Sequence, residues 1–136
     1  MNTEYKSITS WKDVAKALGL DMSLKGDLSN LPMFIRPFVA NTANLAAVVK
    51  AINGDWEPDW DNTNQRKWWG WFLMNKPGFR LYVSGYDVTH THSSGGSRLC
   101  FETEEQFLHA TKYFLPYFEA FYGGKILKIE PVSAAA

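Results

Sequence analysis

Residues 68–84 read WWGWFLMNKPGFRLYVS, and this stretch decides the fold of the 136-residue chain. The run before the turn is apolar throughout, and NKPG at 75–78 is a strong turn signal. After the turn, Phe79, Leu81 and Val83 alternate with more polar residues, which is the pattern of a half-buried strand. The two runs are therefore predicted to pair as an antiparallel hairpin.

The chain beyond the hairpin predicts further strands. An extended run covers 86–92, SSGG at 93–96 turns the chain, and 97–102 forms the last strand. Residues 126–129 are a candidate edge strand. The sheet is therefore predicted to be a three- to four-stranded antiparallel β-meander.

Helical patterns precede the hairpin. Ser10 stands before apolar residues at i, i+3, i+4 and i+7, which predicts a capped helix that ends near Gly19. Pro32 is predicted to open a short helix that Pro37 stops or kinks, because proline lacks a backbone donor. A second helix is predicted over 41–52, where the following Asn-Gly pair closes it.

A long helix is predicted after the sheet. TEEQ at 103–106 has the form of a capping box, and phenylalanines follow it at helical spacing. The helix is expected over 103–122, with Pro116 producing a kink near Lys112 or Tyr113.

These patterns predict an α+β fold with N-terminal helices, the antiparallel meander and a long C-terminal helix packed on one sheet face. A chain of this length is expected to form a single domain. Its successive parts are the helical N-terminal part, a Trp/Asp loop, the sheet, the long helix and a tail, at 1–54, 55–67, 68–102, 103–122 and 123–136.

Composition disfavours several classes of function. Fourteen basic residues balance fourteen acidic ones, so the near-zero net charge disfavours duplex binding by charge alone. Cys100 is the only cysteine, which rules out an intramolecular disulfide, and its apolar neighbours predict a small buried side chain. The N-terminus lacks the apolar region of a signal peptide, and no apolar run reaches the roughly 20 residues of a membrane span. We therefore expect no membrane partner and a cytoplasmic or virion-associated protein.

Five of the six tryptophans lie between residues 55 and 72, among acidic and basic residues. Strand alternation places Trp68 and Phe72 on one face and Trp69 and Trp71 on the other, so both faces are apolar. One face can pack on the long helix, and the other is covered either by the rest of the chain or by a bound partner. The candidate binding residues are Trp56, Asp59, Trp60, Lys67, Trp69, Trp71, Arg80 and Arg98.

No motif for catalysis, a cofactor or a metal is present. The acidic residues at 55–61 lack the central glycine and distal glutamate of a calcium loop, so they are predicted to cap turns. His90 and His92 share one side of an expected strand, but no third ligand accompanies them. The glycine pair at 95–96 lacks the lysine and the strand-to-helix context of a phosphate loop. The sequence therefore predicts no cofactor, and enzymatic activity has no positive support.

Three motifs occur in order: WEPDW at 56–60, KWWGWF at 67–72 and GSRLCF at 96–101, the last followed by a helix. This series resembles an uncharacterised family of small phage and prophage proteins from gut Bacteroidetes, over about residues 51–121. Relatives usually carry tyrosine at positions 68 and 69 and proline at 70, so the entry into the strand differs here. The family has no established activity, and the resemblance implies a phage or prophage context without a mechanism.

Three hypotheses follow, in order of preference. The first is a phage or prophage accessory protein that binds single-stranded nucleic acid or a partner protein through the aromatic face, with Arg66 among the cations. The second is a structural or assembly protein that buries this face in a homo-oligomer. The third is an enzyme that combines Asp59 or Asp61 with His90 or His92, and it ranks well behind.

Overall fold

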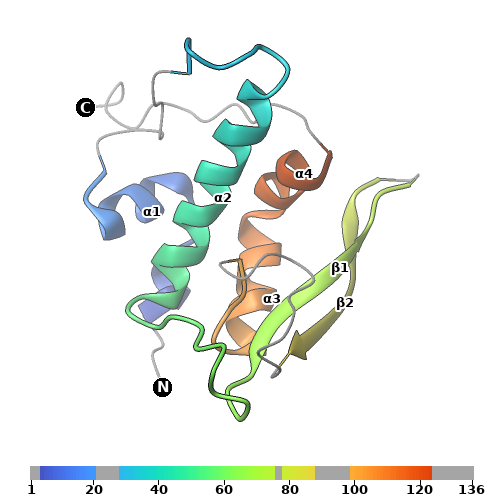
Figure 1. Ribbon diagram of the computed structural model, residues 1–136. Coiled ribbons are helices and arrows are strands. Elements are labelled where there is room, and N and C mark those ends of the chain that lie inside the picture. Colours follow the sequence, from blue (N-terminus) through green and yellow to red (C-terminus); the bar gives the residue numbers. More distant parts are fainter. Residues whose placement is uncertain (1–3, 21–27, 76–77, 88–98, 124–136) are drawn as a thin grey trace.

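The computed structural model describes residues 4–20, 28–75, 78–87 and 99–123, and these residues form a mixed α+β fold with an antiparallel hairpin (Figure 1). A short 3-10 helix, η1, precedes the first α-helix. The elements in chain order are η1 (Glu4–Ser7), α1 (Trp11–Leu18), α2 (Arg36–Asn53), β1 (Lys67–Leu73), β2 (Arg80–Asp87), α3 (Glu104–Tyr113) and α4 (Leu115–Gly123).

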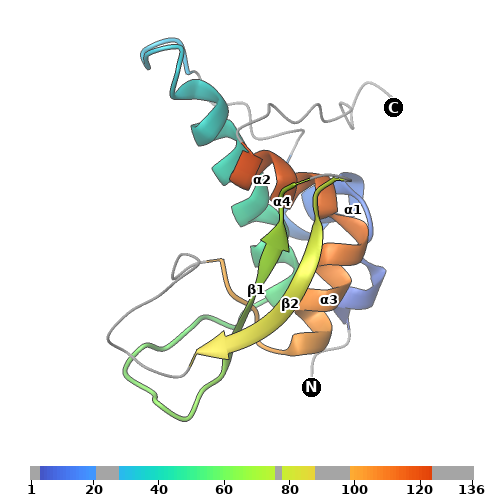
Figure 2. The same ribbon diagram turned by 90° about the vertical axis from the view of Figure 1, so that its right-hand side faces the viewer.

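The elements stack in layers around α2, the longest helix. Helix α2 contacts α1 on one side and α3 and α4 on the other, and α3 in turn contacts both strands. Figures 1 and 2 show the hairpin on the outside of this arrangement, with α3 and α4 between it and α2. One face of the hairpin is therefore directed at helices, and the other is directed away from them.

The core lies where α2 packs against α1, α3 and α4. Large apolar side chains fill it, each contributing about 1.5–3 kcal/mol when fully buried. Its large buried members include Val14, Leu45, Val48, Ile52, Phe101, Phe107, Phe114 and Phe118.

The predicted hairpin is present, with β1 and β2 antiparallel. Its inner face lies so close to α3 that a β-carbon at Gly70 would overlap the ring of Phe107. A β-bulge follows Trp71, where the pairing passes from Trp71–Val83 to Phe72–Leu81. The extra residue of the bulge is therefore on β2.

The sheet differs from the predicted meander. Among the described residues it has two strands rather than three or four. From the expected strand at 97–102, Phe101 alone forms an isolated antiparallel bridge with Trp68, and residues 97–98 lie outside the described part. Most of the expected run at 86–92 and the candidate strand at 126–129 also lie outside it.

Helix α2 begins earlier than the predicted start at residue 41, and Pro37 lies in its first turn. The prediction that Pro37 stops a short helix is wrong, since residues 33–35 form turns and the helix begins at Arg36. Proline fits there because the first helical N–H groups have no intrahelical acceptor and its fixed φ suits a helix. The predicted end is correct, because Gly54 adopts a φ of 65° and donates its N–H to Lys50.

The long C-terminal helix is divided into two. The predicted capping box is present, because Thr103 accepts from the Gln106 N–H at 3.1 Å and Gln106 accepts from the Thr103 N–H at 3.1 Å. Helix α3 ends at Tyr113 and α4 begins at Leu115, so the expected kink is a break. Pro116 supplies the reason, since its nitrogen cannot donate to the preceding turn.

Candidate binding surface on the hairpin

The two faces of β1 have different surroundings. Trp68 and Phe72 pack against the core, and Phe72 stacks on Phe79 and Phe118 with ring centroids 4.9 and 5.2 Å apart. Trp71 lies on the other face and is 57% exposed. The face that points away from α3 is therefore the one that leaves a large indole in contact with solvent.

The outer face, as we call it, consists of Trp69, Trp71, Val83 and Gly85. Register places Trp69 opposite Gly85 and Trp71 opposite Val83, and residues directly opposite share a face. Val83 is 46% exposed, and neighbouring Tyr82, the extra residue of the bulge, is 67% exposed. The result is an accessible aromatic and aliphatic surface across both strands.

Trp69 gives this surface a fixed shape. Two of its ring carbons lie 3.8 Å from where a β-carbon on Gly85 would stand, so the indole extends across the neighbouring strand. Its ring meets Trp71 edge-on, with centroids 5.5 Å apart and planes at 76°. The Trp69 Nε1 atom is buried and has no hydrogen-bond partner among the described residues. Trp69 is thus a half-buried support for the more exposed Trp71.

Lys67, a candidate binding cation, is fully buried. Its Nζ donates to the carbonyls of Asn62 and Gln65, each at 3.1 Å, and lies 5.0 Å from the centre of the Trp60 ring. A charge held in this way organises the loop before β1 and is not presented to solvent.

The other predicted cations also differ in accessibility. Arg80 is half-buried, and its guanidinium donates to the turn carbonyls of Asn75, at 3.1 Å, and Gly78. Arg66 is exposed and lies 4.6 Å from the centre of the Tyr86 ring. Arg98 lies outside the described residues. Among the cations that the structure describes on the hairpin, Arg66 is the most accessible.

The loop that contains Asp59 is organised by its own polar groups. Asp59 Oδ1 accepts from the Asp61 N–H at 3.0 Å, which is the turn-capping role predicted for these acids. Asn62 Oδ1 accepts from the Asn64 N–H at 3.0 Å, and Gln65 Oε1 accepts from the Asp59 N–H at 2.6 Å. No group of three His, Cys, Asp or Glu side chains gathers among the described residues in a way that could hold a metal ion.

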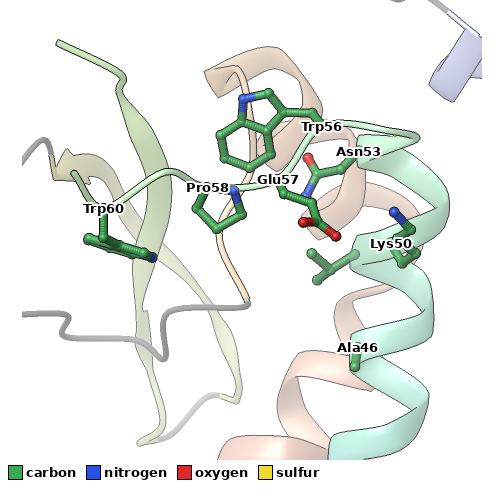
Figure 3. A pocket seen from close by; sticks show the side chains of 8 residues that line it. Ala46, Lys50, Asn53, Trp56, Glu57, Pro58 and Trp60 are labelled. Atoms are coloured by element: carbon green, nitrogen blue, oxygen red, sulfur yellow. The ribbon is translucent and has the colours of Figure 1, made fainter. Parts of the chain in front are cut away.

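Trp56 and Trp60 belong to a separate pocket between this loop and α2 (Figure 3). Figure 3 shows Pro58 between the two indoles, so they do not form one stacking platform. The pocket measures about 300 Å³, at the lower end of the range for ligand pockets. Its lining is Ala46, Val49, Lys50, Asn53, Trp56, Glu57, Pro58 and Trp60.

Two residues of types that often act in catalysis, Cys100 and His109, have structural roles among the described residues. Cys100 is buried as predicted, and desolvation raises the pKa of its thiol to about 11. His109 Nε2 lies 2.7 Å from the Ile8 carbonyl, and the ring meets Tyr5 edge-on at 5.1 Å. The predicted pair His90 and His92 lies outside the described residues.

Sequence patterns missed one exposed apolar patch at the start of α2. Met33, Phe34 and Phe38 are 77%, 84% and 53% exposed, and Figure 2 shows this end of α2 projecting beyond the other helices. Pro37 could have indicated this arrangement, because proline is as common in the first turn of a helix as it is after a helix end. With Pro37 in the first turn, the residues before it precede the helix.

No protein-family model, curated protein or solved structure matches this chain. The resemblance to a phage protein family therefore stays a prediction. None of the described helices combines the length and the apolar character that crossing a bilayer requires.

Proposed function

We propose that this chain is a phage or prophage accessory protein that binds a partner protein through the outer face of its hairpin. The observation that carries the proposal is the 57% exposure of Trp71 on a strand whose opposite face is directed at helices. Indoles that remain accessible beside other apolar groups are enriched at the centres of protein interfaces. The phage context comes from the sequence resemblance.

The available charges favour a protein partner over single-stranded nucleic acid. Binding a strand needs cations that track the phosphates as well as rings that stack on bases. Lys67 is buried on loop carbonyls, and Arg80 donates to the hairpin turn. Arg66 lies against Tyr86, which pairs with Trp68 and not with a residue of the outer face. Among the described residues, few cations are accessible beside the aromatic face, and such a face suits an apolar protein surface better than a nucleic-acid strand.

The described acidic and thiol groups support a binding role better than a catalytic one. Asp59 accepts a backbone hydrogen bond within its own turn, and Cys100 is buried with a raised pKa. Catalysis by a side chain needs a titratable group that is accessible to substrate and poised near the working pH. Binding through shape and apolar contact needs neither.

The test compares two exposed aromatic residues. The chain would be immobilised and used to capture partners from phage-infected host cells, as wild type, as Trp71→Ala and as Phe34→Ala. Phe34 is more exposed than Trp71 but lies in the turn before α2, away from the hairpin, so it is a matched control. We expect Trp71→Ala to lose the partner and Phe34→Ala to retain it. Both variants should keep the wild-type melting temperature within a few degrees, which corresponds to about 1 kcal/mol in the free energy of unfolding.

A second arm examines nucleic acid. Short single-stranded oligonucleotides would be added at low salt while tryptophan emission is recorded. We expect unchanged emission for the wild type. Quenching that Trp71→Ala abolishes would support single-stranded nucleic acid as the ligand and contradict the protein partner.

A further inference from the structure

The pocket between α2 and the loop before β1 has no part in the proposed binding of a partner protein. It contains Trp56 and Trp60, two of the binding residues that the sequence predicts, and it shares no residue with the outer face. Its lining residues all belong to the described stretch 28–75. The pocket is therefore a second candidate site, separate from the hairpin.

Helix α2 supplies one wall of the pocket. Ala46, Val49, Lys50 and Asn53 are spaced at i, i+3, i+4 and i+7, so they lie on one face of the helix. The Asn53 amide is already engaged, because its two polar atoms bond backbone groups of the segment 100–102. On this wall, Lys50 is the polar side chain that remains available to a ligand.

The loop before β1 supplies the opposite wall, and hydrogen bonds hold it in shape. Trp56 donates its N–H to the Asn53 carbonyl at 3.3 Å. The Gln65 side chain accepts from the Asp59 N–H at 2.6 Å and donates to the Glu57 carbonyl at 3.4 Å. A wall that is already formed costs a ligand little ordering entropy.

The position of the Trp60 ring is fixed by Lys67. The Lys67 ammonium lies over the ring, 5.0 Å from its centre, and is itself bonded to loop carbonyls. Figure 3 shows Trp60 and Pro58 on the loop side of the pocket and Ala46 on the helix side. The fixed indole therefore gives the pocket a rigid apolar surface.

Two charged side chains of the lining have no partner among the described residues. Lys50 and Glu57 are both exposed, and neither side chain forms a hydrogen bond or an ion pair there. Figure 3 shows the Glu57 carboxylate extending from the loop towards α2, which carries Lys50. Because no ion pair joins the two, each charge is available to a ligand.

These charges select against ligands with a net charge. A phosphate would meet the Glu57 carboxylate, and a quaternary ammonium would meet the Lys50 ammonium, so each would face a like charge. A neutral sugar would need several hydrogen-bonding groups, but the Asn53 amide is engaged and the rest of the helix wall is apolar. A small molecule with one positive group, one negative group and an apolar body pairs with both charges.

We propose that this pocket binds a free α-amino acid with an apolar side chain. The Lys50 ammonium donates to the carboxylate of the ligand, and the Glu57 carboxylate accepts from its ammonium. The apolar side chain packs against Val49 and the Trp60 ring. The volume of about 300 Å³ suits a small ligand of this kind. An amino acid within a peptide lacks the two free charges, so the site distinguishes the free form.

The first experiment titrates the wild-type protein with each apolar L-amino acid in turn, by isothermal titration calorimetry. The N-acetyl and amide forms of each amino acid are matched ligands, because each lacks one of the two charges. We expect at least one free amino acid to bind, and its blocked forms to bind at least about tenfold more weakly.

Three results of this titration would overturn the proposal. The first is that no amino acid binds at millimolar concentration. The second is that the blocked forms bind as tightly as the free one. The third is that inorganic phosphate or a monosaccharide binds in place of the amino acids.

The second experiment assigns each charge of the ligand to its partner. Glu57→Gln should weaken the free amino acid about tenfold and leave the N-acetyl form unchanged, because that form has no ammonium to lose. Lys50→Met should likewise weaken the free amino acid and leave the amide form unchanged. Lys12→Met, at an exposed lysine of α1, is the matched control and should change neither. Equal losses for free and blocked ligands would contradict the assignment.

The third experiment places the ligand in the pocket. Ala46→Leu adds volume to the lining without removing a charge, and leucine suits an exposed helical position. We expect this variant to lose the amino acid while circular dichroism shows that it is folded. Full binding in folded Ala46→Leu would overturn the proposal. None of these variants alters the outer face, so the amino-acid site and the partner protein are tested separately.

Discussion

Lys67 lies with its ammonium 5.0 Å from the centre of the Trp60 ring, although the lysine is fully buried. A buried charge is costly unless polar groups replace the water it loses. Here the carbonyls of Asn62 and Gln65 and the face of the indole do so. The interaction attaches the loop before β1 to the strand at its first residue.

We expect Lys67→Met to destabilise the protein. The substitution keeps an apolar stem but removes both hydrogen bonds to the loop carbonyls, at a cost of about 1–3 kcal/mol in the free energy of unfolding. Urea denaturation measures this difference. The control is Lys12→Met on the exposed side of α1, which is expected to change stability by no more than about 0.5 kcal/mol. Equal effects of the two substitutions would contradict a structural role for Lys67.

Two glycines of the hairpin should respond differently to alanine. At Gly70 a β-carbon overlaps Phe107, whereas at Gly85 the nearest described atoms lie 3.8 Å away, on Trp69. We expect Gly70→Ala to cost about 1–3 kcal/mol through overpacking and Gly85→Ala to cost less than about 0.5 kcal/mol. Thermal unfolding measures both. The double variant Gly70→Ala with Phe107→Leu should recover part of the lost stability. If it recovers none, the strain of Gly70→Ala does not arise from the contact with Phe107.

Local patterns were sufficient to predict much of this fold. The hairpin, the capping box at Thr103 and the burial of Cys100 follow from alternation, spacing and apolar neighbours within a few residues. The division of β1 into an inner and an outer face follows from the period of a strand. Each of these features depends on contacts that the sequence itself brings close.

The features that were missed depend on contacts between distant segments or on ambiguous signals. Lys67 has the sequence context of a surface cation beside Arg66, and its burial depends on how the preceding loop folds back. Pro37 is compatible with either end of a helix, so its role depends on which neighbouring residues become helical. The exposure of Trp71 could not be predicted, because it depends on whether other elements cover the outer face.

Asp13 gives a prediction for pH dependence. The Thr9 N–H donates to its carboxylate at 3.0 Å, and this bond is the main reason that its pKa is lowered below the ordinary 3.8. A lowered pKa in the folded state stabilises the protein above pH 3.8, and the contribution is lost as the pH falls below that value. Asp13→Asn should therefore lower the melting temperature at pH 7, and the difference from wild type should shrink towards pH 3. A difference that is constant with pH would rule out this contribution.

Cys100 should react slowly with thiol reagents while the protein is folded. The thiol is buried, and desolvation raises its pKa to about 11, so little reactive thiolate is present at pH 8. We expect a colorimetric thiol reagent to react slowly with the native protein and rapidly in denaturant. Rapid reaction under native conditions would mean that the region around Cys100 opens readily.

Two buried asparagines of α2 should differ in their effect on stability. Asn53 Nδ2 donates to the Cys100 carbonyl at 2.9 Å, and its Oδ1 accepts from the Glu102 N–H at 3.2 Å. Asn44 is equally buried, but its Oδ1 has no hydrogen-bond partner among the described residues.

We therefore expect Asn53→Ala to cost about 1–3 kcal/mol, because it leaves two backbone groups without their partner. Asn44→Leu should be neutral or stabilising, since it removes an unsatisfied polar atom and keeps a side chain that branches at the same position. Chemical denaturation of the two variants measures the contrast. If Asn44→Leu were more destabilising than Asn53→Ala, the Asn44 amide would have a role that the described hydrogen bonds do not account for. The link between α2 and the segment after Leu99 would then depend on more than Asn53.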